Sequence, residues 1–208
     1  ETRLQEKPLN VIEMIRQTAS LATDSALPAG AFRRGLNALL PADIRVVDAA
    51  DARPGFDARR QAFGKRYAYL LDNGQVPLPL LARYAWHVPG RLDVAAMRRA
   101  LQGLWGPHDF GAFCAAPGRE QYAVCTVRGL RVVRRKQWLA IVISADRFLH
   151  HMVRNVVGSV IGVGRGTRDP AWLGAGLAGR DRRLAGPTAP AHGLTLVRTF
   201  SQDDAHIF

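Results

Sequence analysis

The fold is decided by Arg147-Phe-Leu-His-His-Met-Val-Arg-Asn-Val-Val-Gly-Ser-Val-Ile-Gly-Val-Gly-Arg-Gly166, a single run of sequence. Apolar side chains recur in it at the i, i+1, i+4, i+5 spacing of a wide helical stripe, which predicts a helix over 148–161 buried against a sheet. The stripe comprises Phe148, Leu149, Met152, Val153, Val156, Val157, Val160 and Ile161. His150, His151, Arg154 and Asn155 fall on the remaining face, and the glycines of 162–166 are expected to end the helix.

Arg154 is the unusual residue of this helix, because it places a charge among apolar neighbours. An arginine is rarely buried without a partner, so one interpretation is that it holds a carboxylate or a phosphate in a cleft. The alternative is an arginine at the edge of the stripe that reaches water along its aliphatic stem. The residues alone leave both interpretations open.

The rest of the chain predicts an α+β fold. Helices are expected over 30–40, 92–104 and 171–178, and strands over 44–47, 62–71, 124–134, 137–145 and 193–200. The segment 11–20 is expected to form a short helix or strand, and His108-Asp109-Phe110 a structural turn. The order strand, strand, helix, helix, strand is typical of a mostly antiparallel sheet with helices on one face.

Composition points to a basic globular protein. Of 208 residues, 48% are hydrophobic, which suffices for one large domain or two small lobes. Lys and Arg number 29 against 17 Asp and Glu, a net charge of +12 that favours nucleic acid as a partner. An arginine excess can also reflect a GC-rich genome, so charge alone does not decide between these explanations.

Several classes of protein are disfavoured. Two cysteines, Cys114 and Cys125, are too few for a disulfide scaffold, and without an apolar leader the expected location is the cytoplasm. The longest apolar stretch, 152–163, is shorter than the ~20 residues of a membrane span. The six histidines and two cysteines lack metal-ligand spacing, so no metal and no membrane association are expected.

Seven segments in order resemble the tRNA pseudouridine synthase A family. They are Leu36-Asn-Ala-Leu-Leu-Pro-Ala-Asp-Ile-Arg-Val46, Phe56-Asp-Ala-Arg59, Lys65-Arg-Tyr-Ala-Tyr69, His108-Asp-Phe110, Phe148-Leu-His-His-Met-Val-Arg-Asn-Val-Val-Gly158, Asp181-Arg182 and Gly193-Leu-Thr-Leu196. The resemblance covers most of the chain. It implies a pseudouridine synthase fold of two ferredoxin-like lobes, here an incomplete N-terminal lobe over 1–86 and a C-terminal lobe over 87–208.

The resemblance also implies a function. Such enzymes isomerise uridine to pseudouridine in the tRNA anticodon stem-loop, need no cofactor and work as homodimers. It places Tyr67 against the target base, Arg154 in a salt bridge to the catalytic aspartate, and Leu194 in the apolar wall of the pocket. These roles are physically reasonable, since a flipped base stacks on an aromatic ring and an arginine keeps a nearby aspartate ionised.

One feature of the family is missing. Its nucleophilic aspartate lies in a Gly-Arg-Thr-Asp-Ala-Gly-Val-His-Ala segment that this sequence does not contain, and an ungapped extension puts Leu9 at that position. Glu6 and Glu13 are the nearest carboxylates, and Asp24 matches no catalytic position. A truncated or mis-joined N-terminus is the expected explanation. The alternatives are a catalytically inactive tRNA-binding paralogue and, last, a basic protein of ribonucleoprotein assembly.

Overall fold

The computed structural model describes residues 18–115, 123–179 and 185–201, and these form two compact units. The smaller unit, Thr18–Gln61, contains α1, Ala29–Leu39. This helix was expected, and Pro28 precedes it as its N-cap. The strand expected over 44–47 is wrong. The side chain of Asn37 instead binds Val46, accepting from its N–H at 2.7 Å and donating to its carbonyl at 2.9 Å, as a neighbouring strand would.

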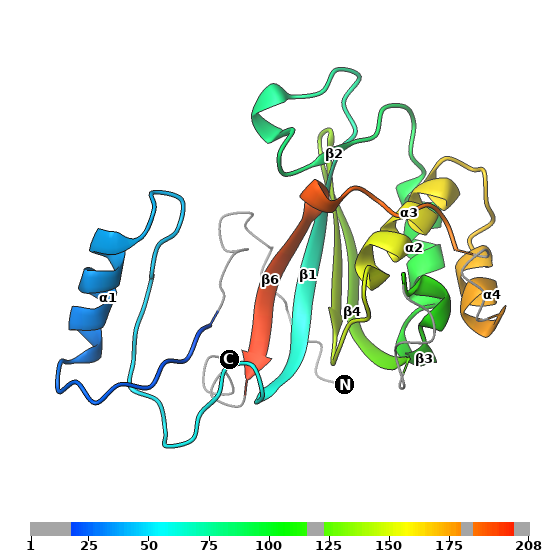
Figure 1. The fold of residues 1–208 in the computed structure, drawn as a ribbon. Coiled ribbons are helices and arrows are strands. Elements are labelled where there is room, and N and C mark those ends of the chain that lie inside the picture. The colour runs from blue at the N-terminus through cyan, green and yellow to red at the C-terminus, as the bar shows by residue number, and fades with distance from the viewer. Residues whose placement is uncertain (1–17, 116–122, 180–184, 202–208) are drawn as a thin grey trace, which may run out of the picture. The chain divides into compact units, whose positions relative to one another are not determined.

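The larger unit is built on one sheet (Figure 1). Its strands are β1 (Ala62–Asp72), β2 (Trp86–His87), β3 (Gly106–Asp109), β4 (Val124–Arg135), β5 (Trp138–Ala145) and β6 (Leu194–Ser201). They are ordered β2-β1-β5-β4-β3, with β6 also pairing with β1. All pairs are antiparallel except the short β1–β2 pair, so the expected α+β class with a mostly antiparallel sheet is confirmed.

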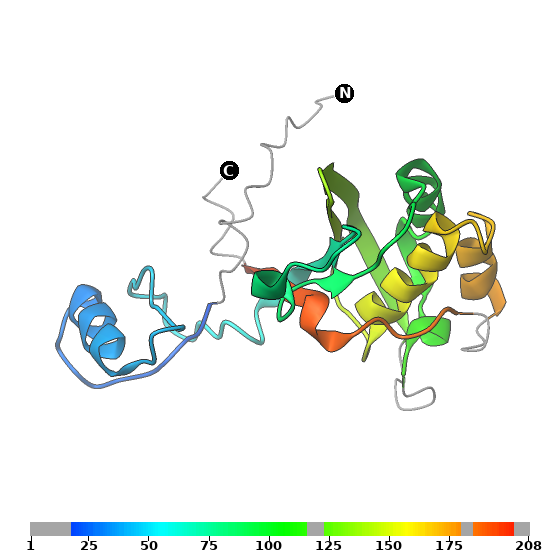
Figure 2. The same ribbon diagram turned by 90° about the horizontal axis from the view of Figure 1, so that it is seen from above.

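Three helices lie on one face of this sheet (Figures 1 and 2). They are α2 (Val94–Gln102), α3 (Met152–Gly164) and α4 (Trp172–Gly179), with short 3-10 turns at Pro79–Leu81, Gly111–Phe113 and Ala191–Gly193. The main core lies between the helices and the sheet and includes Tyr69, Leu71, Ile141, Val157 and Val160, each fully buried. None of the described helices is long and apolar enough to cross a membrane.

The sequence patterns are confirmed for most elements and wrong at particular points. The helix expected from Phe148 starts only at Met152, because His151 has a left-handed φ of 61° that an α-helix cannot contain. Asn155, expected on the polar face, is fully buried. The short strands β2 and β3 were not expected. The segment expected over 11–20 lies almost wholly outside the described residues.

Asp72 ends β1 and organises the turn after it. Its carboxylate is 2% exposed and accepts hydrogen bonds from the N–H groups of Gly74 and Leu78, both at 3.0 Å, and from the Gln137 side chain at 3.1 Å. Burial acts to raise the pKa of Asp72, but these hydrogen bonds outweigh it and hold the pKa below 3.8. The ionised carboxylate is therefore the form that stabilises the fold.

Replacing Asp72 with alanine should lower the free energy of unfolding at neutral pH by about 2 kcal/mol, because three donors in partly buried hydrogen bonds lose their acceptor. Since the folded-state pKa lies below the unfolded value, this contribution is present above the unfolded pKa and is lost as pH falls through the folded pKa. Urea unfolding of wild type and variant, at pH 7 and in strong acid, measures this contribution. If wild type and variant differ in free energy of unfolding by the same amount at both pH values, the ionised carboxylate is not the stabilising form.

Candidate functional site

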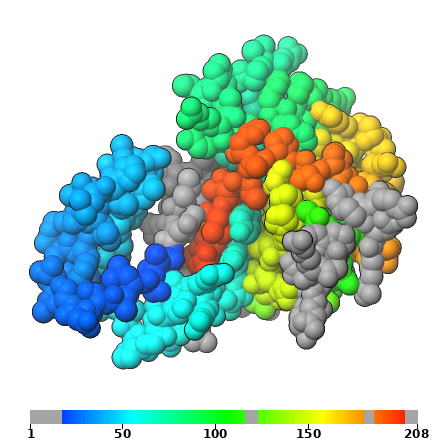
Figure 3. All heavy atoms as spheres, in the orientation of Figure 1, coloured from blue at the N-terminus to red at the C-terminus, as the bar shows by residue number. Residues whose placement is uncertain are grey.

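The segment 185–193, which we call the strap, joins the α4 region to β6 and crosses α3 (Figure 1). It lies at the surface in Figure 3, where it is orange beside the yellow atoms of α3. Close backbone approach holds it there. A Cβ added to Gly158 would overlap the carbonyl oxygen of Pro187, and one added to Gly186 would lie 2.7 Å from Cα of Ser159. Glycines at both positions therefore let the strap pack directly on the helix.

Arg154 is bound to the strap at two points. Its Nε–H donates to the carbonyl of Ala189 at 2.6 Å, and the N–H of Ala189 donates back to the carbonyl of Arg154 at 3.1 Å. The guanidinium is thereby held by one nitrogen. Among the described residues, Nη1 and Nη2 of Arg154 make no hydrogen bond or ion pair. Two adjacent terminal nitrogens of a fixed guanidinium form a fork that matches a carboxylate or phosphate.

Tyr69 fixes the other end of the strap. Its hydroxyl donates to the carbonyl of Pro190 at 2.6 Å, and its ring lies so close to Gly193 that an added Cβ would be 2.6 Å away. Burial raises the pKa of Tyr69, and the charge of Arg154 acts in the opposite direction. Tyr69 is thus a buried support for Arg154, a role that the sequence did not suggest.

Tyr67 lies two residues earlier on β1, at the rim of the same core. Its ring packs edge-on against Phe148, with centroids 4.9 Å apart and planes at 82°. Burial raises the pKa of Tyr67, so its hydroxyl stays protonated at neutral pH. The ring is only partly buried and is packed against the core, which leaves aromatic surface for a further planar group.

Leu194 begins β6 opposite Tyr69, while Tyr67 pairs with Leu196. Its side chain is also partly buried against the core. Leu194 pairs with Tyr69, whose hydroxyl binds the strap next to the residue that holds Arg154, and Tyr67 lies on the same strand as Tyr69. Their roles toward a substrate stay a prediction.

His151 lies immediately before α3, three residues from Arg154. Its ring stacks on that of His150, with centroids 3.9 Å apart and planes at 25°. Burial lowers the pKa of His151, and the charges of His150 and Arg154 lower it further. His151 is therefore neutral at physiological pH and leaves Arg154 as the fixed positive charge at this point.

No described carboxylate of the larger unit pairs with Arg154. The five aspartates of this unit that the structure describes each accept a nearby backbone N–H instead. They are Asp72, Asp93, Asp109, Asp146 and Asp169. They serve as caps and turn residues. Leu9, expected at the position of the family's aspartate, lies outside the described residues, as do Glu6 and Glu13.

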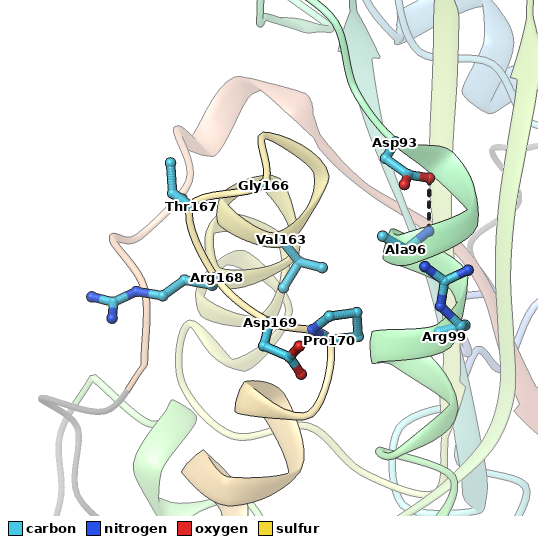
Figure 4. Close-up of a pocket in the computed structure, with 9 residues that line it drawn as sticks. All are labelled: Asp93, Ala96, Arg99, Val163, Gly166, Thr167, Arg168, Asp169 and Pro170. Atoms are coloured by element: carbon cyan, nitrogen blue, oxygen red, sulfur yellow. Dashed lines mark hydrogen bonds between the residues drawn. The ribbon is translucent and has the colours of Figure 1, made fainter.

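A separate hollow lies away from Arg154. It has a volume of about 340 Å³ and opens between the start of α2 and the loop after α3 (Figure 4). Asp93 and Asp169 line it together with Arg99 and Arg168, so its charge is mixed. Arg168 points away from Arg99 in Figure 4 and stacks over the ring of Trp172 at 4.9 Å. This arrangement does not concentrate positive charge as a phosphate site would.

Metal-ligating side chains do not converge in the described part of the chain. No group of three or more His, Cys, Asp or Glu residues there could hold a metal ion. Cys114 and Cys125 are both buried, and neither forms a disulfide. The expected turn at His108-Asp109-Phe110 is instead the end of β3 followed by a 3-10 turn, in which Asp109 accepts the N–H of Gly111 at 2.8 Å.

Comparison with known proteins decides the family. A family model described as tRNA pseudouridine synthase matches residues 100–200. The tRNA pseudouridine synthase A of Myxococcus xanthus is 42% identical over 188 residues, which cover 90% of this chain and 71% of the relative. The chain belongs to the tRNA pseudouridine synthase A family. This confirms the expectation drawn from the seven segments.

Other members of the family show the same similarity. The tRNA pseudouridine synthase A of Chloroflexus aurantiacus is 48% identical over 167 residues, 78% of this chain. That of Syntrophotalea carbinolica is 42% identical over 179 residues, 86% of this chain. The chain spans 60% of the length of the Chloroflexus relative and 71% of the Syntrophotalea relative.

Sequence patterns missed three residues that shape the site. They are Tyr69, Thr188 and Asn155, the last of which was expected on the polar face of α3. A signal for Asn155 was present: Ser159 follows it by four residues, so two polar side chains share one side of an otherwise apolar helix. Two polar residues stacked in a buried stripe indicate a hydrogen-bonded partner segment.

Proposed function

We propose that this chain is a tRNA pseudouridine synthase, an isomerase that converts uridine to pseudouridine in the tRNA anticodon stem-loop without a cofactor. The observation that carries the proposal is the guanidinium of Arg154, fixed by Ala189 and with both terminal nitrogens available among the described residues. The names of the relatives support the same activity. They do not favour the catalytically inactive paralogue.

The proposed reaction is a balanced isomerisation. An aspartate carboxylate bonds to C1′ of the nucleotide as the glycosidic C1′–N1 bond breaks, and the freed uracil rotates. C5 of the uracil then attacks C1′ and expels the carboxylate, and C5 loses its proton while N1 gains one, so that atoms and charge balance. Arg154 would hold the aspartate ionised at neutral pH, because a nearby positive charge lowers a carboxyl pKa. Tyr67 would stack on the flipped uracil, and Leu194 would exclude water from one side of it.

The wider assignments are part of the same proposal. A net charge of +12 supports salt-dependent binding of tRNA phosphates. The proposal also includes a homodimer, a cytoplasmic location, catalysis without a metal, and a division into an incomplete lobe over 1–86 and a lobe over 87–208. Catalysis requires a carboxylate at Arg154, and the family's aspartate motif is absent from the printed sequence.

The test is a single-turnover assay on an unmodified tRNA transcript, with conversion of uridine to pseudouridine measured in the anticodon arm. The expected result is conversion by the wild-type chain that falls about 100-fold or more in Arg154→Ala, since an active-site charge loses its partner. Such a result would mean that a carboxylate of this chain reaches Arg154.

The other outcomes point to other functions. Tight, salt-dependent tRNA binding without conversion would favour the inactive tRNA-binding paralogue. Equal affinity for tRNA and unrelated RNAs, again without conversion, would favour a basic protein of ribonucleoprotein assembly.

A further inference from the structure

The strap is anchored by a buried hydrogen-bond network that begins at Asn155. This side chain is 0% exposed. Its Nδ2 donates to the carbonyl of Phe113 at 2.6 Å, and its Oδ1 accepts from the hydroxyl of Thr188 at 2.6 Å. Because the Phe113 carbonyl can only accept, the amide nitrogen must face it, which leaves the amide oxygen for Thr188. The direction of the Thr188 hydrogen bond is therefore determined.

A second pair anchors the strap nearby. The hydroxyl of Ser159 donates to the backbone carbonyl of Asn155 at 2.8 Å and accepts the N–H of Gly186 at 2.7 Å. Ala189, which binds Arg154, is thus flanked by anchored residues on both sides: Thr188 before it and Pro190, held by Tyr69, after it. The carbonyl that orients the Arg154 Nε is consequently fixed from both directions.

We propose that Thr188 and Asn155 are positioning residues for Arg154, acting through the Ala189 carbonyl to set the direction of the guanidinium. The inference rests on the proposed function, in which Arg154 holds the carboxylate that attacks the nucleotide. Asn155 adjoins Arg154 in sequence, but neighbouring residues of a helix diverge by about 100°, so the two side chains point to different sides of α3. Asn155 therefore acts through the strap rather than by touching the substrate.

The physical reason is geometric. A guanidinium held by Nε alone rotates with the carbonyl that accepts it, and the strap around Ala189 has no strand or helix ladder of its own. Without the Thr188 hydroxyl, the peptide before Ala189 loses its side-chain anchor to α3. The fork of Nη1 and Nη2 then samples more directions, and binding geometry of this kind tolerates little displacement.

The test uses Thr188→Val, which keeps the shape of the side chain and removes the hydroxyl, and Thr188→Ser, which restores it. Thr199→Val is the matched control, because Thr199 lies on β6 away from the strap. The first measurement is hydrogen exchange of the Arg154 Nε–H by NMR, its signal assigned by its loss in Arg154→Ala. Exchange should be about 10-fold faster in Thr188→Val and near wild type in Thr188→Ser and Thr199→Val.

The second measurement is a double-mutant cycle on the single-turnover rate of uridine conversion. Thr188→Val should lower this rate about 5-fold when Arg154 is present and less than about 2-fold in Arg154→Ala, because coupled residues are not additive. A purely structural role would lower the rate equally in both backgrounds. Thermal unfolding of each variant confirms that the proteins compared are folded.

The two proposals fail in different ways. Unchanged Nε–H exchange in Thr188→Val, or an equal loss of rate in both Arg154 backgrounds, would overturn the positioning role and leave the proposed function intact. If Arg154→Ala itself converts uridine like wild type, the role of Arg154 in the proposed function is wrong. The exchange measurement still decides whether Thr188 sets the guanidinium.

Discussion

Replacing Arg154 with lysine should abolish nearly as much activity as replacing it with alanine, although lysine keeps the positive charge. The Nε–H of Arg154 is used by the Ala189 carbonyl, while Nη1 and Nη2 make no bond among the described residues. A lysine has one nitrogen for both tasks. It must either bind the strap or face the anion, so we expect conversion to fall at least about 100-fold.

The assay is single-turnover conversion of a tRNA transcript by wild type, Arg154→Lys and Arg154→Ala. Arg91→Lys is the matched control, because Arg91 is exposed before α2 and the substitution preserves net charge. Its activity should equal that of wild type. Retention of more than about a tenth of the activity in Arg154→Lys would mean that charge alone suffices, which contradicts the fork geometry.

Gly158→Ala should be the most destabilising small substitution in α3. Alanine normally stabilises a helix interior relative to glycine by about 1 kcal/mol. Here the added methyl would overlap the carbonyl oxygen of Pro187, a backbone atom that can move only if the strap leaves the helix. We therefore expect the free energy of unfolding to fall by about 3 kcal/mol, at the upper end of the cost of overpacking.

Gly174→Ala is the control for this experiment. Gly174 lies inside α4, and an added Cβ would meet no atom within 4 Å, so the same substitution should stabilise the protein by about 0.5–1 kcal/mol. Urea unfolding of both variants tests whether Gly158→Ala lowers the free energy of unfolding and Gly174→Ala raises it. A stabilising Gly158→Ala would show that the strap does not pack on α3 in solution.

Periodicity predicted the elements that bury a continuous apolar pattern. The strand around Tyr67, the hairpin of β4 and β5, and the body of α3 were all predicted, because alternation and helical stripes directly encode which side faces a core. The left-handed residue His151 was not predicted. Nothing in its sequence context marks a positive φ, which is uncommon for a residue other than glycine.

The site was predicted only in part, because the sequence identifies unusual side chains but not the backbone atoms that they bind. Arg154 was singled out because a charged side chain in an apolar helix is rarely buried without a partner. The partner that the structure describes is a backbone carbonyl, that of Ala189, and carbonyls leave no mark in a sequence. The same holds for Tyr69, whose hydroxyl binds Pro190, and for Asn155, whose amide binds Phe113. The spacing of Asn155 and Ser159 indicates that a partner exists, but the sequence does not identify the backbone atom that binds each side chain.

The pairing of β1 has a consequence for synthesis on the ribosome. Tyr67 lies beside Ile143 of β5 on one edge and Leu196 of β6 on the other. Both partners are translated long after β1, so at about 5–20 residues per second this strand waits for seconds with its long edges unpaired. β1 is rich in aromatic and apolar side chains, the composition that favours intermolecular pairing. The nascent chain is therefore most prone to aggregate before β6 leaves the ribosome. Ribosome-associated chaperones that bind exposed strands should raise the yield of folded protein.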